Sequence, residues 1–369
     1  LYGLTIKIFK KMLRNIDGRQ IVIPLSAGHD SRLVASILKE LEYKNVVCYS
    51  YGLSGNFEDK TAKSIAKKLG YKYHFIPLRH FSEKAFYLSD EYKKYLKFSE
   101  TFSSVPFIQS LSTIKYLKES NLIDNNAVFI NGMSGDFISG VHINYLGKTI
   151  NENNNSISSK EVILNTIIQK HFSLWGSLTS SDKNIKQIKK SLWLEIERSC
   201  GPLISQNSHA YYEYSEFIDR QSKYVIMGQR AYEFYGHEWR LPLWDNEFID
   251  FWLKVPARLK KDQSLYLEML KKSNFGNVWG ENYPVNKREI VPKWVIPLRF
   301  LCKLPFALFG QKGKVRWHEF ETIFFYYWMD NTRMMSSTSY WRVIKSIWKK
   351  PQNHVSWQAK DYLKSHNLK

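Results

Sequence analysis

The amino-acid sequence predicts an α/β fold, in which a parallel sheet is followed by a helical C-terminal cap. Over residues 1–145, short β-branched runs alternate with helical patterns, which is typical of βαβ units and a parallel sheet. Turns of small residues and glycine follow these runs, at the strand ends where open α/β sheets bind ligands. Beyond residue 170 the pattern becomes helical and strongly aromatic, which predicts helices packed against the sheet.

The elements of the first half follow one another in a regular order. Each expected strand is a short apolar run, and each expected helix has apolar residues three or four positions apart. Gly70 is expected to end the second of these helices, because glycine tolerates a left-handed backbone. The expected strands are 20–25, 45–51, 73–77 and 127–131, and the expected helices are 32–41, 58–69, 82–97 and 104–119.

The stretch 147–160 is polar and without periodicity, and it predicts an exposed loop. This loop divides the chain into two expected parts. Residues 1–150 form an α/β core, and residues 151–369 form a helical part that ends in a basic, aromatic region.

The chain is strongly basic, with 54 Lys and Arg against 34 Asp and Glu and a formal net charge of +20. Such an excess predicts an anionic partner, such as a nucleotide, a nucleic acid, an acidic glycan or an anionic lipid. The widely spaced Cys48, Cys200 and Cys302 favour neither a disulfide framework nor a cysteine-rich zinc site, and they suit a cytoplasmic location. We find no signal peptide and no apolar run long enough to span a bilayer.

The segment from Leu25 to Arg32, with the sequence LSAGHDSR, joins the first expected strand to the first expected helix. Small residues let backbone N–H groups approach a pyrophosphate, and Ser26 and Ser31 add hydroxyl donors at the positive end of the helix. Asp30 would repel such an anion unless a cation lay between them, so it implies Mg²⁺. Ordinary helix capping by Ser and Asp is the alternative interpretation, although capping does not require this whole arrangement after a strand.

The SAGHDS motif resembles the PP-loop, usually SGGxDS, of N-type ATP pyrophosphatases. More narrowly, the chain is similar to the synthetase domain of asparagine synthetase and its relatives, including β-lactam synthetase, from residue 4 to about residue 290. The resemblance implies a parallel sheet of the adenine nucleotide alpha hydrolase-like type. It also makes residues 1–150 the ATP-binding core.

Three further motifs occur in the order that this family shows. The segment 131–140, NGMSGDFISG, is similar to SG(E/D)GADElfgG and places Asp136 on the family's second Mg²⁺-binding aspartate, as the partner of Asp30. The segment 238–245, EWRLPLWD, looks like ExRxPFLD, whose polar residues are mostly architectural in the family. The segment 285–288, VNKR, stands in the place of RxKxgF, and a solvated lysine in a basic turn is the alternative interpretation for Lys287.

The resemblance assigns roles residue by residue. It implies that Lys287 contacts the phosphates during catalysis together with Asp30 and Asp136, and that Ser50 to Gly52 frame the adenine base with Leu25. The expected structural residues are Glu238, Arg240 and Asp245, and the expected metal ligands are Asp30 and Asp136. The expected ATP and pyrophosphate contacts are Leu25, Ser26, Ala27, Gly28, His29, Asp30, Ser31, Arg32, Ser50, Tyr51, Gly52, Gly132 and Lys287.

The reaction that the resemblance implies is adenylation of a carboxylate by ATP with Mg²⁺, followed by displacement of AMP by ammonia or an amine. The chain departs from asparagine synthetases at Met133 and Phe137, where these enzymes carry acidic residues. A methionine cannot act as a base, so the acceptor is not expected to be free aspartate. His29 and Arg32 are also unusual in this loop, and Arg32 is a candidate to hold a phosphate or an acidic substrate.

The sequence contains no N-terminal glutaminase domain of the kind found in glutamine-dependent relatives. Ammonia or an amine is therefore expected from solution, from a separate glutaminase, or from a domain missing before Leu1. Shortened relatives of this kind resemble proteins encoded in bacterial surface-polysaccharide loci, where amidation of a sugar acid is a plausible task. The carboxylate substrate is accordingly a small molecule or a glycan.

In the region 291–350, basic residues alternate with aromatic ones. This pattern is expected of a protein that binds the inner face of an anionic membrane. A helical cap with its aromatic residues in the core is the alternative interpretation.

Two other functions remain open for the whole chain. One is a PP-loop enzyme that modifies tRNA. The positive net charge favours this function, whereas the motifs and the lack of paired cysteines do not. The other is a degenerate scaffold that only binds nucleotide, which Met133 and Phe137 favour.

Overall fold

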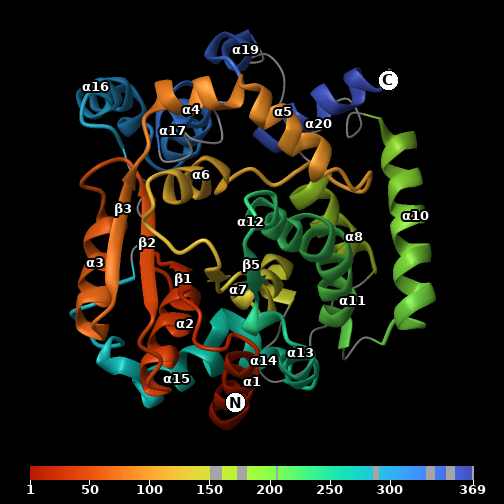
Figure 1. Ribbon diagram of the computed structural model, residues 1–369. Coiled ribbons are helices and arrows are strands. Elements are labelled where there is room, and N and C mark those ends of the chain that lie inside the picture. Colours follow the sequence, from red (N-terminus) through yellow and green to blue (C-terminus); the bar gives the residue numbers. More distant parts are fainter. Residues whose placement is uncertain are drawn as a thin grey trace.

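The computed structural model describes residues 1–149, 160–172, 181–204, 207–285, 291–329, 337–345 and 354–367. Its centre is a five-stranded parallel sheet with the order β3-β2-β1-β4-β5 (Figure 1). The order reverses between β1 and β4, which is the position where open α/β sheets bind ligands. The strands are β1 (Ile21–Pro24), β2 (Val46–Gly52), β3 (Lys72–Pro77), β4 (Val128–Ile130) and β5 (Glu238–Arg240).

Alternate side chains of the central strands enter two separate hydrophobic cores. Ile21 and Ile23 of β1 belong to one core, whereas Val22 between them belongs to the other. Both faces of the sheet are apolar because helices cover both, as is usual for parallel sheets. The first core includes side chains of α1 (Tyr2–Arg14), α2 (His29–Glu40), α3 (Phe57–Leu69), α13 (Asn246–Leu253) and α15 (Ser264–Ser273), and the second those of α5 (Asp90–Phe98), α6 (Leu111–Glu119) and α12 (Arg230–Phe234).

The four predicted strands and the first two predicted helices are confirmed, and Gly70 ends α3 with a φ of 77°. The predicted helix 82–97 is instead two helices, α4 (His80–Tyr87) and α5. The break arises because Ser89 Oγ accepts a hydrogen bond of 3.2 Å from the Tyr92 amide and caps a new helix. The predicted helix 104–119 begins only at Leu111, the first residue of α6.

The fifth strand comes from the second half of the chain. β5 pairs with β4 through only three residues, and its short run with Glu238 and Arg240 gave no strand pattern in the sequence. The boundary proposed at residue 150 therefore separates β5 from the other strands of the same sheet. Of the predicted loop 147–160, residues 150–159 lie outside the described residues.

The other described elements are helical. α10 and α16 lie at opposite sides of the molecule (Figure 1). None of the described helices is both long and apolar enough to cross a membrane. These elements are α7 (Gly135–Ile138), η1 (His142–Thr149), α8 (Lys160–Ile167), η2 (Ile168–Phe172), α10 (Asp182–Cys200), α11 (Ser208–Ser215), η4 (Glu216–Val225), η5 (Ile226–Gln229), η6 (Pro242–Trp244), α14 (Ala257–Lys260), η7 (Lys261–Gln263), η8 (Phe275–Asn277), α16 (Val295–Ala307), α17 (Gly310–Phe324), η9 (Tyr326–Trp328), α19 (Tyr340–Lys345) and α20 (His354–Ser365).

Candidate active site

The loop between β1 and α2 is held by two serine side chains. Ser31 Oγ accepts a hydrogen bond of 3.0 Å from the Ser26 amide and lies 3.1 Å from Ser26 Oγ. Ser26 Oγ in turn accepts a hydrogen bond of 3.1 Å from the amide of Gly28, the residue directly before α2. The positive end of the α2 dipole therefore lies at the carboxyl edge of the sheet, where an anion is stabilised.

Asp30, in the first turn of α2, lies directly against the loop that follows β4. A Cβ atom built on Gly132 would lie 2.5 Å from the carbonyl carbon of Asp30, and one built on Gly135 would lie 2.6 Å from its Cγ atom. Only glycine leaves room for so close an approach. Tyr266 of α15, which is fully buried, donates a hydrogen bond of 2.9 Å to Asp30 Oδ1.

The carboxylates of Asp30 and Asp136 interact across this contact. Burial, and then the negative charge of Asp136, raises the pKa of Asp30 to about 7. Asp136 lies in α7, and its side chain is 52% exposed. One half-buried and one largely exposed carboxylate that repel each other form a site that a cation would stabilise.

These two carboxylates fit a Mg²⁺ ion whose other ligands include phosphate oxygens. Mg²⁺ in nucleotide sites is usually held by one or two carboxylates together with phosphate oxygens. Within the part of the chain that the structure describes, no group of three or more His, Cys, Asp or Glu side chains is arranged to hold a metal. Asp30 and Asp136 would therefore hold the ion only together with oxygen atoms of a bound substrate.

A cavity of about 270 Å³ opens beside Asp30, at the carboxyl ends of β1, β2 and β4. Its lining combines backbone, hydroxyl and amide groups with two aromatic rings, which suits a polar ligand with a flat base. The residues expected from the sequence that line it are Ser26, Gly28, His29, Asp30, Ser31, Tyr51 and Gly132. The others are Pro24, Gln109, Ser110, Asn131, Met133 and Tyr232.

Other expected contact residues do not line this cavity. Leu25 and Ala27 are each 1% exposed, and Leu25 belongs to the first core. The Ser50 hydroxyl is bonded to the hydroxyl of Tyr73. Gly52 ends β2 with a φ of 139°, a conformation that glycine adopts readily. These residues shape the backbone around the cavity without reaching into it.

Arg32 is buried, and its guanidinium faces backbone carbonyls. It is 2% exposed, and its guanidinium donates hydrogen bonds to the carbonyls of Ala27 (2.9 Å), Tyr283 (2.7 Å) and Val278 (3.3 Å). It also lies 5.3 Å from the centre of the Trp279 ring, and burial lowers its pKa to about 10. These hydrogen bonds direct the guanidinium to backbone carbonyls, and the expectation that Arg32 holds a phosphate or an acidic substrate stays a prediction.

The residues expected to be structural form ion pairs away from the cavity. Glu238 lies between Arg19 (2.6 Å) and Arg240 (2.8 Å), and hydrogen bonds from these two guanidinium groups lower its pKa to about 2. Asp245 caps α13 by accepting a hydrogen bond of 2.9 Å from the Glu247 amide. Arg19 thus connects β5 to the N-terminal segment, and Lys11 connects the start of α13 to it through an ion pair of 3.3 Å with Asp245.

A comparison with protein families matches the profile of asparagine synthase to residues 14–274, well over half of the chain. The match includes the β1–α2 loop, the loop after β4 and the segment 238–245. The chain belongs to the asparagine synthase family. A search of curated proteins found no match. The matched region is an ATP-dependent amidotransferase domain, and its five-stranded parallel sheet is the adenine nucleotide alpha hydrolase type expected from the sequence.

The structure places Met133 and Phe137, the two positions where acidic residues are expected in asparagine synthetases. Met133 lines the cavity, and its Sδ accepts a hydrogen bond of 3.0 Å from Gln229 Nε2, while Gln229 Oε1 accepts one of 2.9 Å from Asn131. Phe137 is 6% exposed and packs in the first core. Neither position supplies a carboxylate to the site. Lys287 lies beyond the matched segment and outside the described residues.

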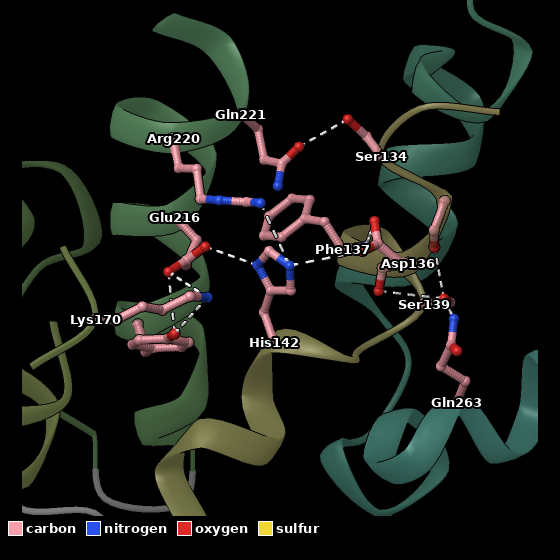
Figure 2. Close-up of polar contacts among 12 residues, drawn as sticks. Ser134, Asp136, Phe137, Ser139, His142, Lys170, Glu216, Arg220, Gln221 and Gln263 are labelled. Carbon is pink, nitrogen blue, oxygen red and sulfur yellow. Dashed lines mark hydrogen bonds and ion pairs between the residues drawn. The ribbon is translucent and has the colours of Figure 1, made fainter. Parts of the chain in front are cut away.

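A second polar cluster lies beside Asp136 (Figure 2). At its centre is Glu216, which is fully buried at the start of η4. Its carboxylate accepts hydrogen bonds from His142 Nδ1 (2.7 Å) and the Tyr212 hydroxyl (3.0 Å), and it pairs with the Lys170 ammonium at 2.8 Å. The cluster therefore connects η1, η2 and α11 at one buried charge.

The partners of Glu216 keep it ionised. Burial alone would raise its pKa, but hydrogen bonds from His142 and His171 and the charge of Lys170 hold it well below the usual range. Because His142 Nδ1 donates to Glu216, its Nε2 faces the other way, 3.9 Å from Asp136 Oδ2 and 3.4 Å from the Arg220 guanidinium. No motif predicted this cluster, since its members come from four separate elements.

Proposed function

We propose that this chain joins a carboxylate to ammonia or an amine, with ATP converted to AMP and pyrophosphate. The observation that carries the proposal is the contact between Asp30 and the loop that holds Asp136, beside a cavity at the switch point of the sheet. Membership of the asparagine synthase family supports the same reaction class.

The proposed reaction has two steps. A carboxylate oxygen attacks the α-phosphorus of ATP, a new P–O bond forms, and the bond to the bridging oxygen breaks with loss of pyrophosphate. The amine nitrogen then attacks the acyl carbon, a C–N bond forms, the C–O bond to AMP breaks, and the nitrogen releases a proton to solvent. A bound Mg²⁺ would neutralise part of the phosphate charge that grows in the first step.

The chain's own residues would act mainly by position and charge. The Ser26–Ser31 loop and the first turn of α2 would bind the pyrophosphate, since amide and hydroxyl donors stabilise developing negative charge. Asp30 and Asp136 would hold the metal, and Lys287 is proposed to contact the phosphates. Tyr51, whose ring lines the cavity, would lie beside the nucleotide.

We further propose that the acceptor is a carboxylate other than free aspartate. Met133 reaches the cavity at the position where the asparagine synthetases carry an acid, and a thioether neither accepts a proton nor binds an ammonium group strongly. Uronic acids and other sugar acids are the first class to examine, with amidation of a surface polysaccharide as the context. A separate glutaminase is one candidate source of ammonia.

Pyrophosphate release tests the proposal. The protein is incubated with ATP, Mg²⁺, ammonium and a panel of uronic and amino acids, and we expect release that depends on one class of acid. Asp30→Asn and Asp136→Asn should each lower the rate at least about 100-fold. Asp90→Asn is the matched control, because the Asp90 side chain is 84% exposed and pairs with the exposed Lys93. Equal rates in all variants would contradict the assignment of the two carboxylates.

The same assay separates the alternatives. Binding of ATP without turnover of any acid would favour a nucleotide-binding scaffold, for which the replacement of both family acids by Met133 and Phe137 is the supporting observation. Pyrophosphate release that requires tRNA would instead favour a tRNA-modifying enzyme. Lys287→Met, compared with Lys293→Met, tests whether the lysine of the fourth motif contributes to the rate.

A further inference from the structure

The outward surface of α16 is apolar, although it faces solvent. The helix packs one stripe of side chains, Val295, Cys302 and Phe306, into a small core with Trp317 of α17. Apart from the exposed Lys303, the rest of its circumference and both of its ends are hydrophobic. The exposed apolar side chains are Trp294 (60%), Ile296 (52%), Leu298 (50%), Phe300 (63%), Leu301 (61%), Leu304 (49%), Leu308 (85%) and Phe309 (62%).

The outer face of α16 differs from that of an ordinary surface helix. Such a helix buries an apolar stripe and carries polar residues on its outer face. On α16 the buried stripe contains Arg299, which pairs with Glu321 of α17, while leucine and phenylalanine face outward. A contiguous apolar surface of this kind indicates a binding site for a protein or a membrane.

Basic side chains surround the apolar surface. Among the residues from 293 to 321 there are six Lys and Arg and two Glu, and Glu321 is 6% exposed and paired with Arg299. The accessible charge is therefore almost entirely positive. Long basic side chains place their alkyl stems against apolar surface and their charges at its border. The exposed basic residues are Lys293 before α16, Lys303 on it, and Lys312, Lys314 and Arg316 in α17.

The orientation of this surface is fixed by contacts with the rest of the molecule. The ring of His80, the first residue of α4, packs edge-on against Tyr327 and at a tilt against Trp328 of η9, with ring centres 4.8 Å and 5.0 Å apart. Trp328 also contacts the ring of Trp294 at 5.6 Å. α16 consequently lies at the outer edge of the molecule (Figure 1), and most of its apolar side chains are exposed there.

We propose that α16, together with the basic first half of α17, docks on an anionic lipid bilayer. The helix lies in the plane of the interface, its apolar side chains enter the acyl boundary, and the lysine and arginine side chains contact lipid phosphates. With 13 residues, α16 is far shorter than the roughly 20 that a membrane-spanning helix requires. Charge complementarity favours a lipid surface over a second copy of this basic chain, because two copies would bring like charges together.

Vesicle co-sedimentation of the full chain tests this proposal independently of any enzymatic activity. We expect binding to vesicles of phosphatidylcholine with phosphatidylglycerol, weaker binding when salt is raised, and little binding to phosphatidylcholine alone. The double variant Leu301→Glu/Leu304→Glu and the double variant Lys312→Glu/Lys314→Glu should each lower the partition coefficient about tenfold or more.

Matched controls lie on α10, at the opposite side of the molecule (Figure 1). Leu194 is 57% exposed, and Leu194→Glu should leave vesicle binding unchanged. Lys186→Glu/Lys190→Glu makes the same change of charge as the α17 variant and should bind as the wild type does, apart from a small general charge effect. Circular dichroism confirms that each variant is folded.

Three outcomes would overturn the proposal. The first is no binding of the wild type to anionic vesicles. The second is equal loss of binding in the α10 and α17 charge variants, which would show a general effect of net charge. The third is self-association of the wild type in size-exclusion chromatography that Leu301→Glu/Leu304→Glu abolishes, without vesicle binding, which would show that a second copy covers α16.

Discussion

The hydroxyl of Tyr266 donates a hydrogen bond of 2.9 Å to Asp30 Oδ1, although the two residues are 236 positions apart in the chain. Tyr266 is fully buried in α15, and burial together with the nearby Asp30 charge raises its pKa well above the usual value. It therefore stays a donor at any ordinary pH. The helical half of the chain thus orients a carboxylate that the sequence places in the first half.

Tyr266→Phe removes this donor without changing the volume of the side chain much. We expect the free energy of unfolding to fall by about 1–3 kcal/mol, because a half-buried carboxylate loses a hydrogen-bond donor. The rate of pyrophosphate release should fall as well, since Asp30 is no longer held toward the loop after β4. Urea unfolding and the release assay measure the two effects.

Tyr214→Phe is the matched control for that substitution. The Tyr214 hydroxyl donates a hydrogen bond of 2.7 Å to Ser199 at an exposed position. Its loss should change the unfolding free energy by less than about 0.5 kcal/mol. If both variants unfold at the same urea concentration as the wild type, the hydrogen bond to Asp30 does not stabilise the site.

Gly135→Ala tests the close approach of the two loops. The new Cβ would lie 2.6 Å from Asp30 Cγ and 2.7 Å from Leu243 Cδ1, so Asp30 would have to move. We expect loss of pyrophosphate release together with a loss of stability of about 1–3 kcal/mol from overpacking. Thermal unfolding and the release assay measure these effects. Gly280→Ala is the control, because a Cβ there would meet no atom within 4 Å, and a wild-type rate in Gly135→Ala would contradict the proposed geometry.

The sequence was sufficient to predict four of the five strands of the sheet and to bring the predicted site residues to one edge of it. Ser26, Asp30 and Gly132 follow predicted strands, and parallel strands bring their carboxyl ends to one edge, so these residues had to lie near each other. β5 could not be predicted in this way. It has three residues and gains its strand conformation only from pairing with β4, a partner more than 100 positions earlier in the chain.

The roles of single side chains were harder to predict than the fold. Arg32 stands in an anion-binding loop, yet its guanidinium turns to the carbonyls of Val278 and Tyr283. The sequence carries no sign of these partners, because backbone acceptors are the same at every residue. Glu216 likewise appears in no motif, and only the fold surrounds it with basic groups.

Arg32→Lys tests the structural role of this arginine. A lysine has one ammonium group and cannot reach three carbonyls in different directions, so at least one buried carbonyl would lose its partner. We expect a loss of about 1–3 kcal/mol in the free energy of unfolding. Arg14→Lys, at an exposed position in the last turn of α1, should be neutral in the same urea titration. Unchanged stability of Arg32→Lys, with weaker ATP binding, would instead support direct contact with phosphate.

The buried Glu216 makes stability depend on pH. Its pKa in the folded chain lies well below the usual value, so folding favours the ionised form. Its contribution is therefore fully present above about pH 4.3, the ordinary pKa of a glutamate, and is lost as the pH falls toward the lower folded pKa. Glu216→Gln should lower the unfolding free energy at pH 7 by about 3–5 kcal/mol, since it leaves the Lys170 ammonium buried without its carboxylate.

Urea unfolding at pH 7, 5 and 4 measures this dependence, and the informative quantity is the difference between the wild type and Glu216→Gln. The difference should be constant from pH 7 to pH 5 and should shrink below that, because Glu216 then takes up a proton in the unfolded wild type, which favours unfolding. Glu161→Gln is the control, because the Glu161 side chain is 65% exposed in its pair with Lys189 and surface pairs contribute little. Two results would mean that the charge of Glu216 does not hold His142 and Lys170 in place. One is a stability difference that stays the same down to pH 4. The other is a difference at pH 7 that is no larger than the one caused by Glu161→Gln.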